Sequence, residues 1–178
     1  MECSIFTQDR SQQAIDIFKD VFTASEGQAE GEVIADFVST LIATTAPEDL
    51  IGCIADANGT MAGCIFFSRF RVPDGQSAFI LSPVAVATAV QGKGIGSQLI
   101  RYGLEQLRAA GVNLVFTYGD PAYYSKVGFR QISEDVIKAP FPLSQPIGWL
   151  AQSLDGKDIP AMAGASQCVA ALNNPDLW

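Results

Sequence analysis

The sequence contains no histidine, and none of its four cysteines stands in a Cys-x-x-Cys pair. Cysteine pairs and histidines supply most structural zinc ligands, and histidine is a common axial ligand of haem. Both absences argue against a zinc or haem protein, so we expect no metal site. The lack of histidine also removes the commonest general base at neutral pH from any reaction that the chain performs.

Long hydrophobic runs are also missing, since no apolar stretch approaches the roughly 20 residues that a membrane-spanning helix needs. The first ten residues, MECSIFTQDR, are too polar and acidic for a signal peptide. We therefore expect a cytoplasmic protein with no membrane partner.

Basic residues are scarce, with 11 lysines and arginines against 19 aspartates and glutamates and a net charge of −8. Nucleic-acid binding relies on clustered lysine and arginine that neutralise phosphates, so this balance disfavours a nucleic-acid partner. An acidic chain suits a cationic substrate such as an amine. Acidity also serves solubility alone, and the sequence leaves both interpretations open.

Cys53 and Cys64 flank an Asn58-Gly59 pair, which is a strong signal for a two-residue hairpin turn. In that register the two cysteines lie directly opposite each other, with α carbons about 5.5 Å apart, a separation that a disulfide can span. The alternatives are a disulfide and two buried thiols, and a reducing cytoplasm favours the thiols.

The pattern of apolar residues predicts one domain over residues 1–178, a length that buries a core of ordinary size. Helical spacing appears in residues 11–23 and again from Val33 to Ile42, on either side of a polar loop, SEGQAEG. A further helix is expected over 95–110. Strands are expected over 3–7, 50–56, 60–70, 77–86 and 114–118.

The strand at 77–86, the helix at 95–110 and the strand at 114–118 form a βαβ unit, so the two strands should be parallel. Pro83 lies inside the first of them and cannot donate a ladder hydrogen bond, which predicts a bulge or a parting of strands at Ser82-Pro83. A helical turn or two should follow Pro121 and end at Gly128. Three segments of the tail read as strands that complete the sheet: 129–133, 148–154 and 167–172.

The glycine-rich stretch that opens the helix at 95–110 reads Gln91-Gly-Lys-Gly-Ile-Gly96. A helix N-terminus with exposed backbone N–H groups binds anions, and glycines let a phosphate approach the backbone. A Walker loop does not fit, because Lys93 is followed by Gly94 and not by serine or threonine. A dinucleotide fingerprint does not fit either, because the glycines are spaced G-x-G-x-G and lie in the middle of the chain.

The stretch does match Q/R-x-x-G-x-G/A after an apolar strand, and here the sequence resembles the GNAT superfamily of acyl-CoA-dependent N-acetyltransferases. The resemblance runs from Phe79 to Phe129 and includes the segment Tyr124-Ser-Lys-Val-Gly-Phe129. It implies a GNAT-like α/β (α+β) fold, a mixed, mostly antiparallel twisted sheet of about 6–8 strands flanked by about four helices. Within one domain, 1–178, the parallel βαβ unit in 79–129 would form the acetyl-CoA-binding and catalytic core.

The resemblance also implies which residues act. Tyr124, four residues before the glycine of Tyr-x-x-x-Gly-Phe, would be the catalytic residue that hydrogen-bonds the departing sulfur of CoA. Backbone groups would bind the pantetheine arm and the pyrophosphate of acetyl-CoA, the cosubstrate. These cofactor-binding residues are Val84, Ala85, Val86, Gln91, Gly92, Lys93, Gly94, Ile95, Gly96 and Ser97.

The activity implied is transfer of an acetyl group to a primary amine of a small molecule or protein, by direct attack through a ternary complex. A non-catalytic acyl-CoA-binding module of the same fold is the alternative, because no general base is identifiable. Asp120 is one candidate base, but aspartate before proline is also an ordinary turn residue. Glu30, Glu32 and Glu48 cannot be ranked, and a homodimer is left open.

Overall fold

The computed structural model describes all of residues 1–178. The α-helices are α1 (Ser11–Glu26), α2 (Gln28–Thr44), α3 (Ile95–Ala109) and α4 (Pro121–Tyr124). The strands are β1 (Glu2–Ile5), β2 (Leu50–Ala57), β3 (Thr60–Arg71), β4 (Ser77–Val86), β5 (Leu114–Tyr118), β6 (Arg130–Gln131) and β7 (Trp149–Ser153). None of the helices combines the length and apolar character that a membrane-spanning segment requires.

The seven strands form a mixed sheet in the order β1-β2-β3-β4-β5-β7-β6. β4 and β5 are parallel, as the βαβ pattern predicted. The pairs β1–β2, β5–β7 and β6–β7 are antiparallel. Seven strands with four helices confirm the predicted fold class.

The chain forms two compact units, each built from two segments. The first unit consists of Met1–Phe67 and Pro83–Gly103, and the second of Ser68–Ser82 and Leu104–Trp178. A chain boundary between them falls between Ser82 and Pro83, inside β4. The single domain over 1–178, with its core at 79–129, stays a prediction.

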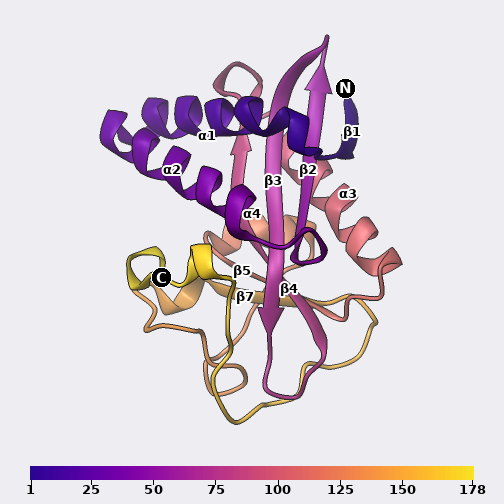
Figure 1. The fold of residues 1–178 in the computed structure, drawn as a ribbon. Coiled ribbons are helices and arrows are strands. Elements are labelled where there is room, and N and C mark those ends of the chain that lie inside the picture. Colours follow the sequence, from indigo (N-terminus) through magenta and orange to yellow (C-terminus); the bar gives the residue numbers. More distant parts are fainter. The chain divides into compact units, whose positions relative to one another are not determined.

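In the first unit, helices α1 and α2 pack side by side (Figure 1). The loop expected at residues 25–31 is wrong, because both helices extend into it and leave only Gly27, whose φ is 103°, between them. Gly31 lies inside α2, where a Cβ would come within 2.9 Å of the Lys19 carbonyl oxygen and closer still to Thr23. This glycine therefore allows close helix packing and does not end a helix.

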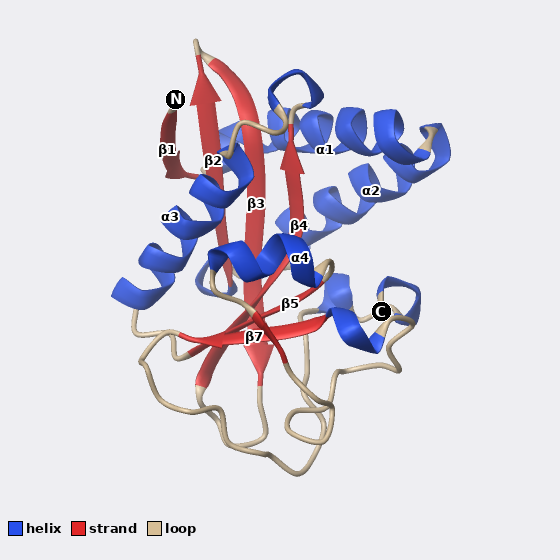
Figure 2. Cartoon of the chain, turned by 180° about the vertical axis from the view of Figure 1, so that it is seen from behind, coloured by secondary structure: helices blue, strands red, loops and turns tan.

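The Asn58-Gly59 hairpin turn between β2 and β3 is confirmed, with φ values of 53° and 78° that suit a type I′ turn. One face of these strands packs on α1, where the Phe18 and Phe66 rings stack at 6.2 Å. The other face packs on α3, where Gly103 approaches Phe67 and Cys53. The two opposite views in Figure 1 and Figure 2 show α1 and α3 on these two faces.

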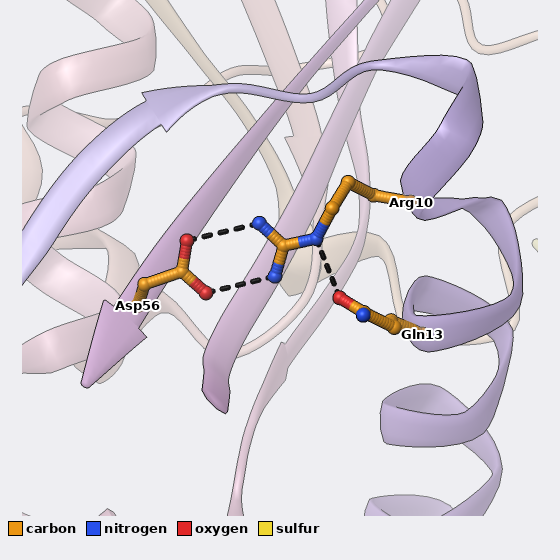
Figure 3. A network of polar contacts seen from close by, with 3 residues as sticks. All are labelled: Arg10, Gln13 and Asp56. Carbon is orange, nitrogen blue, oxygen red and sulfur yellow. Dashed lines mark hydrogen bonds and ion pairs between the residues drawn. The ribbon is translucent and has the colours of Figure 1, made fainter. Parts of the chain in front are cut away.

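An ion pair fastens the start of α1 to the end of β2 (Figure 3). The Arg10 guanidinium donates to both carboxylate oxygens of Asp56, at 3.0 and 2.8 Å. Its Nε donates to the side-chain oxygen of Gln13, one turn into α1. Hydrogen bonds from Arg10, opposed by some burial, lower the pKa of Asp56.

In the second unit, aromatic rings form the core beside β5 and β7. Phe116 stacks on Trp149 at 5.3 Å, and Phe70 lies 4.7 Å from Phe116. The tail reaches this cluster through Trp178, which is 6% exposed and lies 6.0 Å from Trp149. The strand expected over 129–133 is shorter, as β6, and the one over 148–154 is confirmed as β7.

The strand expected over 167–172 is wrong. Gln167 makes only an isolated antiparallel bridge with Arg71, and Ala170–Leu172 is a 3-10 helix. The apolar residues of this segment instead serve the core of the tail, where Leu172 is 3% exposed and its carbonyl oxygen accepts a hydrogen bond from the Trp178 indole. A short apolar run does not by itself separate a strand from such a turn.

Candidate functional site

Pairing of β4 with β5 ends before either strand does. The register runs from Ala78↔Leu114 to Leu81↔Thr117 and stops there, although β4 continues through Pro83 to Val86. The predicted parting of strands at Ser82-Pro83 is therefore confirmed on the β5 side. Beyond the end of β4, Ala87 N donates to Ala62 O at 2.9 Å, so this end of the strand stays bonded toward β3.

Three predicted cofactor-binding residues lie on this last part of β4. Val84 and Val86 are half-buried, whereas the Ala85 side chain is 2% exposed and lies in the core. A ligand could reach Ala85 only through its backbone, which is the kind of contact that the sequence predicted. The Val86 carbonyl oxygen already accepts a hydrogen bond of 2.9 Å from Gln91 Nε2.

The loop Gln91–Gly94 is exposed and needs its glycines for backbone conformation. Gly92 and Gly94 have φ values of 75° and 80°, and a Cβ at either position would meet no atom within 4 Å. The left-handed conformation, and not a steric clash inside the protein, is therefore what favours glycine here. Gly96 differs, because it is buried in the first turn of α3.

Helix α3 begins directly after this loop. Its first turn is closed by a hydrogen bond of 3.0 Å from Gln98 N to Gly94 O. The N–H groups of Ile95, Gly96 and Ser97 consequently have no acceptor within the helix. Together with the positive end of the helix dipole, they favour an anion such as a phosphate at this terminus. The Lys93 side chain is exposed, and Ser97 is half-buried.

The first unit thus brings the predicted cofactor-binding residues into one place. The side chain of Gln91 spans from the loop to the end of β4 and joins the two groups of residues, 84–86 and 91–97. The predicted catalytic residue, Tyr124, belongs to the second unit.

Tyr124 lies at the end of α4, a helix whose boundaries follow from its sequence. Asp120 caps the N-terminus by accepting from Ala122 N at 2.9 Å, and Pro121 takes the first helical position. A 3-10 turn follows, and it ends at Gly128 with φ 98°, as predicted. The exposed Asp120 carboxylate is therefore engaged as a helix cap.

The ring of Tyr124 is half-buried between other aromatic rings and a glycine. Phe129 and Tyr123 meet it edge to face, with centroids 5.8 and 5.0 Å away. On another side the ring lies against the backbone of Gly119, where a Cβ would come within 2.7 Å of Cε2. These contacts hold the Tyr124 ring in its position.

Near Tyr124 in the second unit, Thr117 Oγ1 of β5 donates to Leu81 O of β4 at 2.9 Å. Burial raises the pKa of Tyr124 to about 12, against a smaller opposing effect of the Thr117 hydroxyl. The phenol is therefore neutral near pH 7 and has a proton to donate.

Thr117 and Gly119 were not among the residues that the sequence singled out. Thr117 is the one fully buried residue with a polar side chain in the strand LVFTY, and it is 1% exposed. A buried hydroxyl near the end of a strand requires a partner, and this was the available signal. Gly119 gave no signal, because its need for glycine depends on where the Tyr124 ring lies.

All four cysteines are free thiols, so Cys53 and Cys64 form no disulfide. Both are fully buried. Burial raises the pKa of Cys53 to about 12, and it raises the pKa of Cys64 well above its usual range. The thiolate is the nucleophilic form, so these two side chains are chemically inert.

Each unit also has an open cavity, and neither is lined by a predicted site residue. In the first unit, a cavity of about 570 Å³ lies between α1 and the β2–β3 turn, where Asp16 and Asp20 line it. In the second unit, a cavity of about 640 Å³ lies along β6 and β7, where Arg130 and Lys157 line it.

Comparison with known proteins gives consistent matches. The family model of the GNAT acetyltransferase domain matches residues 48–131. The uncharacterized N-acetyltransferase YjhQ of Escherichia coli is 32% identical over 140 residues, which are 75% of this chain and 77% of the relative. YhbS, another uncharacterized N-acetyltransferase of Escherichia coli, is 29% identical over 119 residues, 66% of this chain and 68% of that protein.

Solved structures have the same fold. The crystal structure of Escherichia coli YhbS in complex with CoA matches with a TM-score of 0.76 and 21% identity, over 97% of this chain and 92% of that one. A GNAT family acetyltransferase from Brucella melitensis, in complex with acetyl-CoA, matches with a TM-score of 0.72 and 27% identity, over 96% of each chain. On these matches in sequence and fold, the chain belongs to the GNAT family of N-acetyltransferases.

Proposed function

We propose that the chain transfers the acetyl group of acetyl-CoA to a primary amine of a small molecule or a protein, by direct attack in a ternary complex. The observation that carries this proposal is the N-terminus of α3, whose first backbone N–H groups have no acceptor within the helix. It directly follows Gly92 and Gly94, two glycines in the left-handed conformation. Relatives with CoA or acetyl-CoA bound support the choice of cosubstrate. That the acceptor is a primary amine, that the protein is cytoplasmic and that it forms a homodimer all stay predictions.

The backbone of the first unit would bind the cosubstrate. The N–H groups from Gln91 to Gly96, with the Ser97 hydroxyl, would hold the pyrophosphate, and Lys93 would lie near an outer phosphate or in solvent. The backbone of Val84, Ala85 and Val86 would pair with the pantetheine arm as if it were an added strand. The Val86 carbonyl oxygen already accepts a hydrogen bond from Gln91. The other backbone N–H and C=O groups of residues 84–86 would therefore make most of the hydrogen bonds to the pantetheine arm.

In the reaction, the lone pair of a neutral amine attacks the thioester carbonyl carbon, and a backbone N–H near Val86 stabilises the oxyanion. The carbon–sulfur bond then breaks, CoA leaves as a thiolate, and the nitrogen loses one proton. Tyr124 donates a hydrogen bond to that thiolate. A free thiol has a pKa of about 8.5 and Tyr124 of about 12, so complete proton transfer from the phenol would be uphill by about 5 kcal/mol.

The proton released by the amine therefore has to reach the solvent or the departing sulfur by another route. Asp120 is a poor candidate for the base, because its carboxylate caps α4. Tyr124 serves as a donor to sulfur, and substrate amines enter the reaction in their neutral form. The rate should consequently rise with pH as the acceptor amine deprotonates.

The test is release of free CoA from acetyl-CoA across a panel of amines: a polyamine, an aminoglycoside, an aromatic amine and a lysine-containing peptide. We expect turnover with at least one class, and Tyr124→Phe should lower kcat by about tenfold to a hundredfold with little change in KM. Binding of acetyl-CoA without turnover on a broad panel would favour the acyl-CoA-binding module. Failure to bind acetyl-CoA, or full binding by Gly94→Glu, would overturn the proposed site.

A further inference from the structure

A side-chain hydrogen bond connects the glycine loop back to the end of β4. Gln91 Nε2 donates to the carbonyl oxygen of Val86, the last residue of β4, at 2.9 Å. Only the amide nitrogen of a glutamine side chain can donate to a carbonyl oxygen, so the orientation of this carboxamide is determined. Residues 87–90 lie between the two ends of the bond and are enclosed by it.

Backbone hydrogen bonds hold this enclosed segment. Ala87 N donates to Ala62 O at 2.9 Å, which attaches the segment to β3. Val90 N donates to Ala87 O at 2.9 Å and closes a 3-10 turn over Thr88–Val90. The segment is therefore ordered up to Gln91, where the glycine loop begins.

The loop beyond Gln91 has few contacts of its own. Residues 91–94 are exposed, and a Cβ at Gly92 or Gly94 would meet no atom within 4 Å. Glycine has more backbone freedom than any other residue, so the loop backbone could take several positions relative to β4. The next fixed point is the first turn of α3, where Gln98 N donates to Gly94 O. The Gln91 hydrogen bond thus fastens the beginning of the loop to the sheet.

The position of the loop relative to β4 matters to the proposed cosubstrate. Its pantetheine arm would lie on residues 84–86 and its pyrophosphate on residues 91–97, so one ligand spans both segments. Two parts of a linked ligand reinforce each other only when the separation of their sites matches the link. Sites that already have this separation in the free protein need no rearrangement on binding.

We propose that the side chain of Gln91 is a positioning residue for acetyl-CoA: through its bond to the Val86 carbonyl oxygen, it keeps the pyrophosphate loop at the distance from the pantetheine segment that the cosubstrate requires. The carboxamide does this without touching the ligand. The inference rests on the proposed function, because it requires acetyl-CoA to lie across both segments.

Three substitutions test the hydrogen bond. Gln91→Met keeps a side chain of similar length and removes the donor. Gln91→Arg keeps N–H donors at a similar reach and should rescue the function. Gln98→Met is the matched control, because it makes the same change at an exposed glutamine in the first turn of α3. Both glutamines are exposed, so we expect all three variants to fold, and melting temperatures check this.

The probes are CoA and two of its parts, pantetheine and ADP, each of which would contact only one of the two segments. The Kd for CoA is measured by calorimetry, and those for the parts by displacement of CoA. Gln91→Met should weaken CoA by about threefold to tenfold, as expected for the loss of one hydrogen bond. It should weaken pantetheine and ADP by less than about twofold each, because neither part depends on the separation.

Gln91→Arg should bind CoA within about threefold of the wild type, both at about 0.1 M and at about 0.5 M salt, where charge attraction is screened. A rescue that disappears at the higher salt would show a general attraction to phosphate and would overturn the inference. Equal weakening of CoA and ADP by Gln91→Met would show that the side chain contacts the phosphates directly, and this would also overturn it.

The inference fails as well if Gln91→Met binds CoA as tightly as the wild type does, or if Gln98→Met loses as much affinity. In each of these cases the wild-type protein still binds CoA, and the proposed function stands. If the wild-type protein does not bind CoA or acetyl-CoA, the proposed site fails and the role of Gln91 fails with it.

Discussion

The ring of Tyr124 lies so close to the backbone of Gly119 that a Cβ there would come within 2.7 Å of Cε2. The φ angle of Gly119 is not in the left-handed region, so the glycine is needed for space and not for conformation. Gly119 therefore fixes where the proposed catalytic side chain lies, together with Phe129 on its other side.

Gly119→Ala should displace the Tyr124 ring. Overpacking at such a contact costs about 1–3 kcal/mol of unfolding free energy, and we expect a loss of acetyl-transfer rate at least as large as that of Tyr124→Phe. Turnover and the melting temperature would be measured together. The matched control is Gly52→Ala, where a Cβ would come within 2.6 Å of Phe6 and near no proposed site residue, so it should lower the melting temperature without the loss of rate. An unchanged rate in Gly119→Ala would contradict this account of the ring.

Gly94 offers a prediction about backbone conformation, because its φ is 80° and its Cβ position is open. Asparagine tolerates the left-handed region and valine does not. Gly94→Asn should therefore keep most of the affinity for acetyl-CoA, and Gly94→Val should lose at least tenfold, an energy of about 1–2 kcal/mol. The measurement is the Kd by calorimetry.

The control for this series lies in the β2–β3 turn, at Gly59, whose φ is 78° and whose Cβ position is equally open. Gly59→Val should lower the melting temperature about as much as Gly94→Val does, and it should leave the Kd for acetyl-CoA unchanged. Equal affinities for Gly94→Asn and Gly94→Val would argue that the loop backbone does not touch the ligand.

The buried thiols predict a dependence of stability on alkaline pH. Burial raises the pKa of Cys53 to about 12 and that of Cys64 still further from its usual value. Their contribution is complete below the unfolded pKa of about 8.5 and is lost as the pH rises toward the folded values. Between about pH 9 and 10.5, each thiol should reduce the unfolding free energy by up to about 1.4 kcal/mol per pH unit.

Urea denaturation at several pH values measures this slope. The double variant Cys53→Ala/Cys64→Ala should be less stable at pH 7 because of the cavities, but its stability should fall less steeply above pH 9. Cys168→Ala is the control, because Cys168 is half-buried and its removal should leave most of the slope. Identical slopes in the wild type and the double variant would mean that the two thiols do not stay protonated in the folded chain.

Much of the fold could be predicted because local chemistry determines it. The Asn58-Gly59 turn has the positive φ angles that only a few residue types accept. β4 and β5 have the bounds that their apolar runs indicate. Pro83 marked where β4 leaves β5, because a proline cannot extend the ladder. In each case one or two residues carry the signal by themselves.

What could not be predicted depends on residues distant in sequence. Gly31 looked like part of a loop, but its role is to admit Thr23 and Lys19 of the neighbouring helix. In the same way, Gly119 is required only because the Tyr124 ring packs on it, and the buried Thr117 hydroxyl finds its partner in the carbonyl oxygen of Leu81, on another strand. Such relationships arise from packing, and a single sequence contains no pattern that reports them.

The Arg10–Asp56 ion pair predicts a dependence of stability on acidic pH. The pKa of Asp56 is lowered mainly by the hydrogen bonds from Arg10. The contribution of the pair is therefore present above the unfolded pKa of about 3.9 and is lost as the pH falls through the lowered folded pKa. Since the two side chains are 22% and 27% exposed, removal of the pair should cost about 1 kcal/mol at pH 7.

A double-mutant cycle with Arg10→Met and Asp56→Asn measures this coupling, and it should shrink toward zero as the pH falls through the lowered folded pKa of Asp56. Arg130→Met, at an exposed arginine of β6, removes the same charge and should change stability by less than about 0.5 kcal/mol. Because Arg10 also donates to Gln13, which lines the cavity beside α1, Arg10→Met should loosen the first turn of that helix. Faster amide hydrogen exchange at residues 11–15 would report this loosening, and unchanged exchange there would restrict the role of Arg10 to its ion pair.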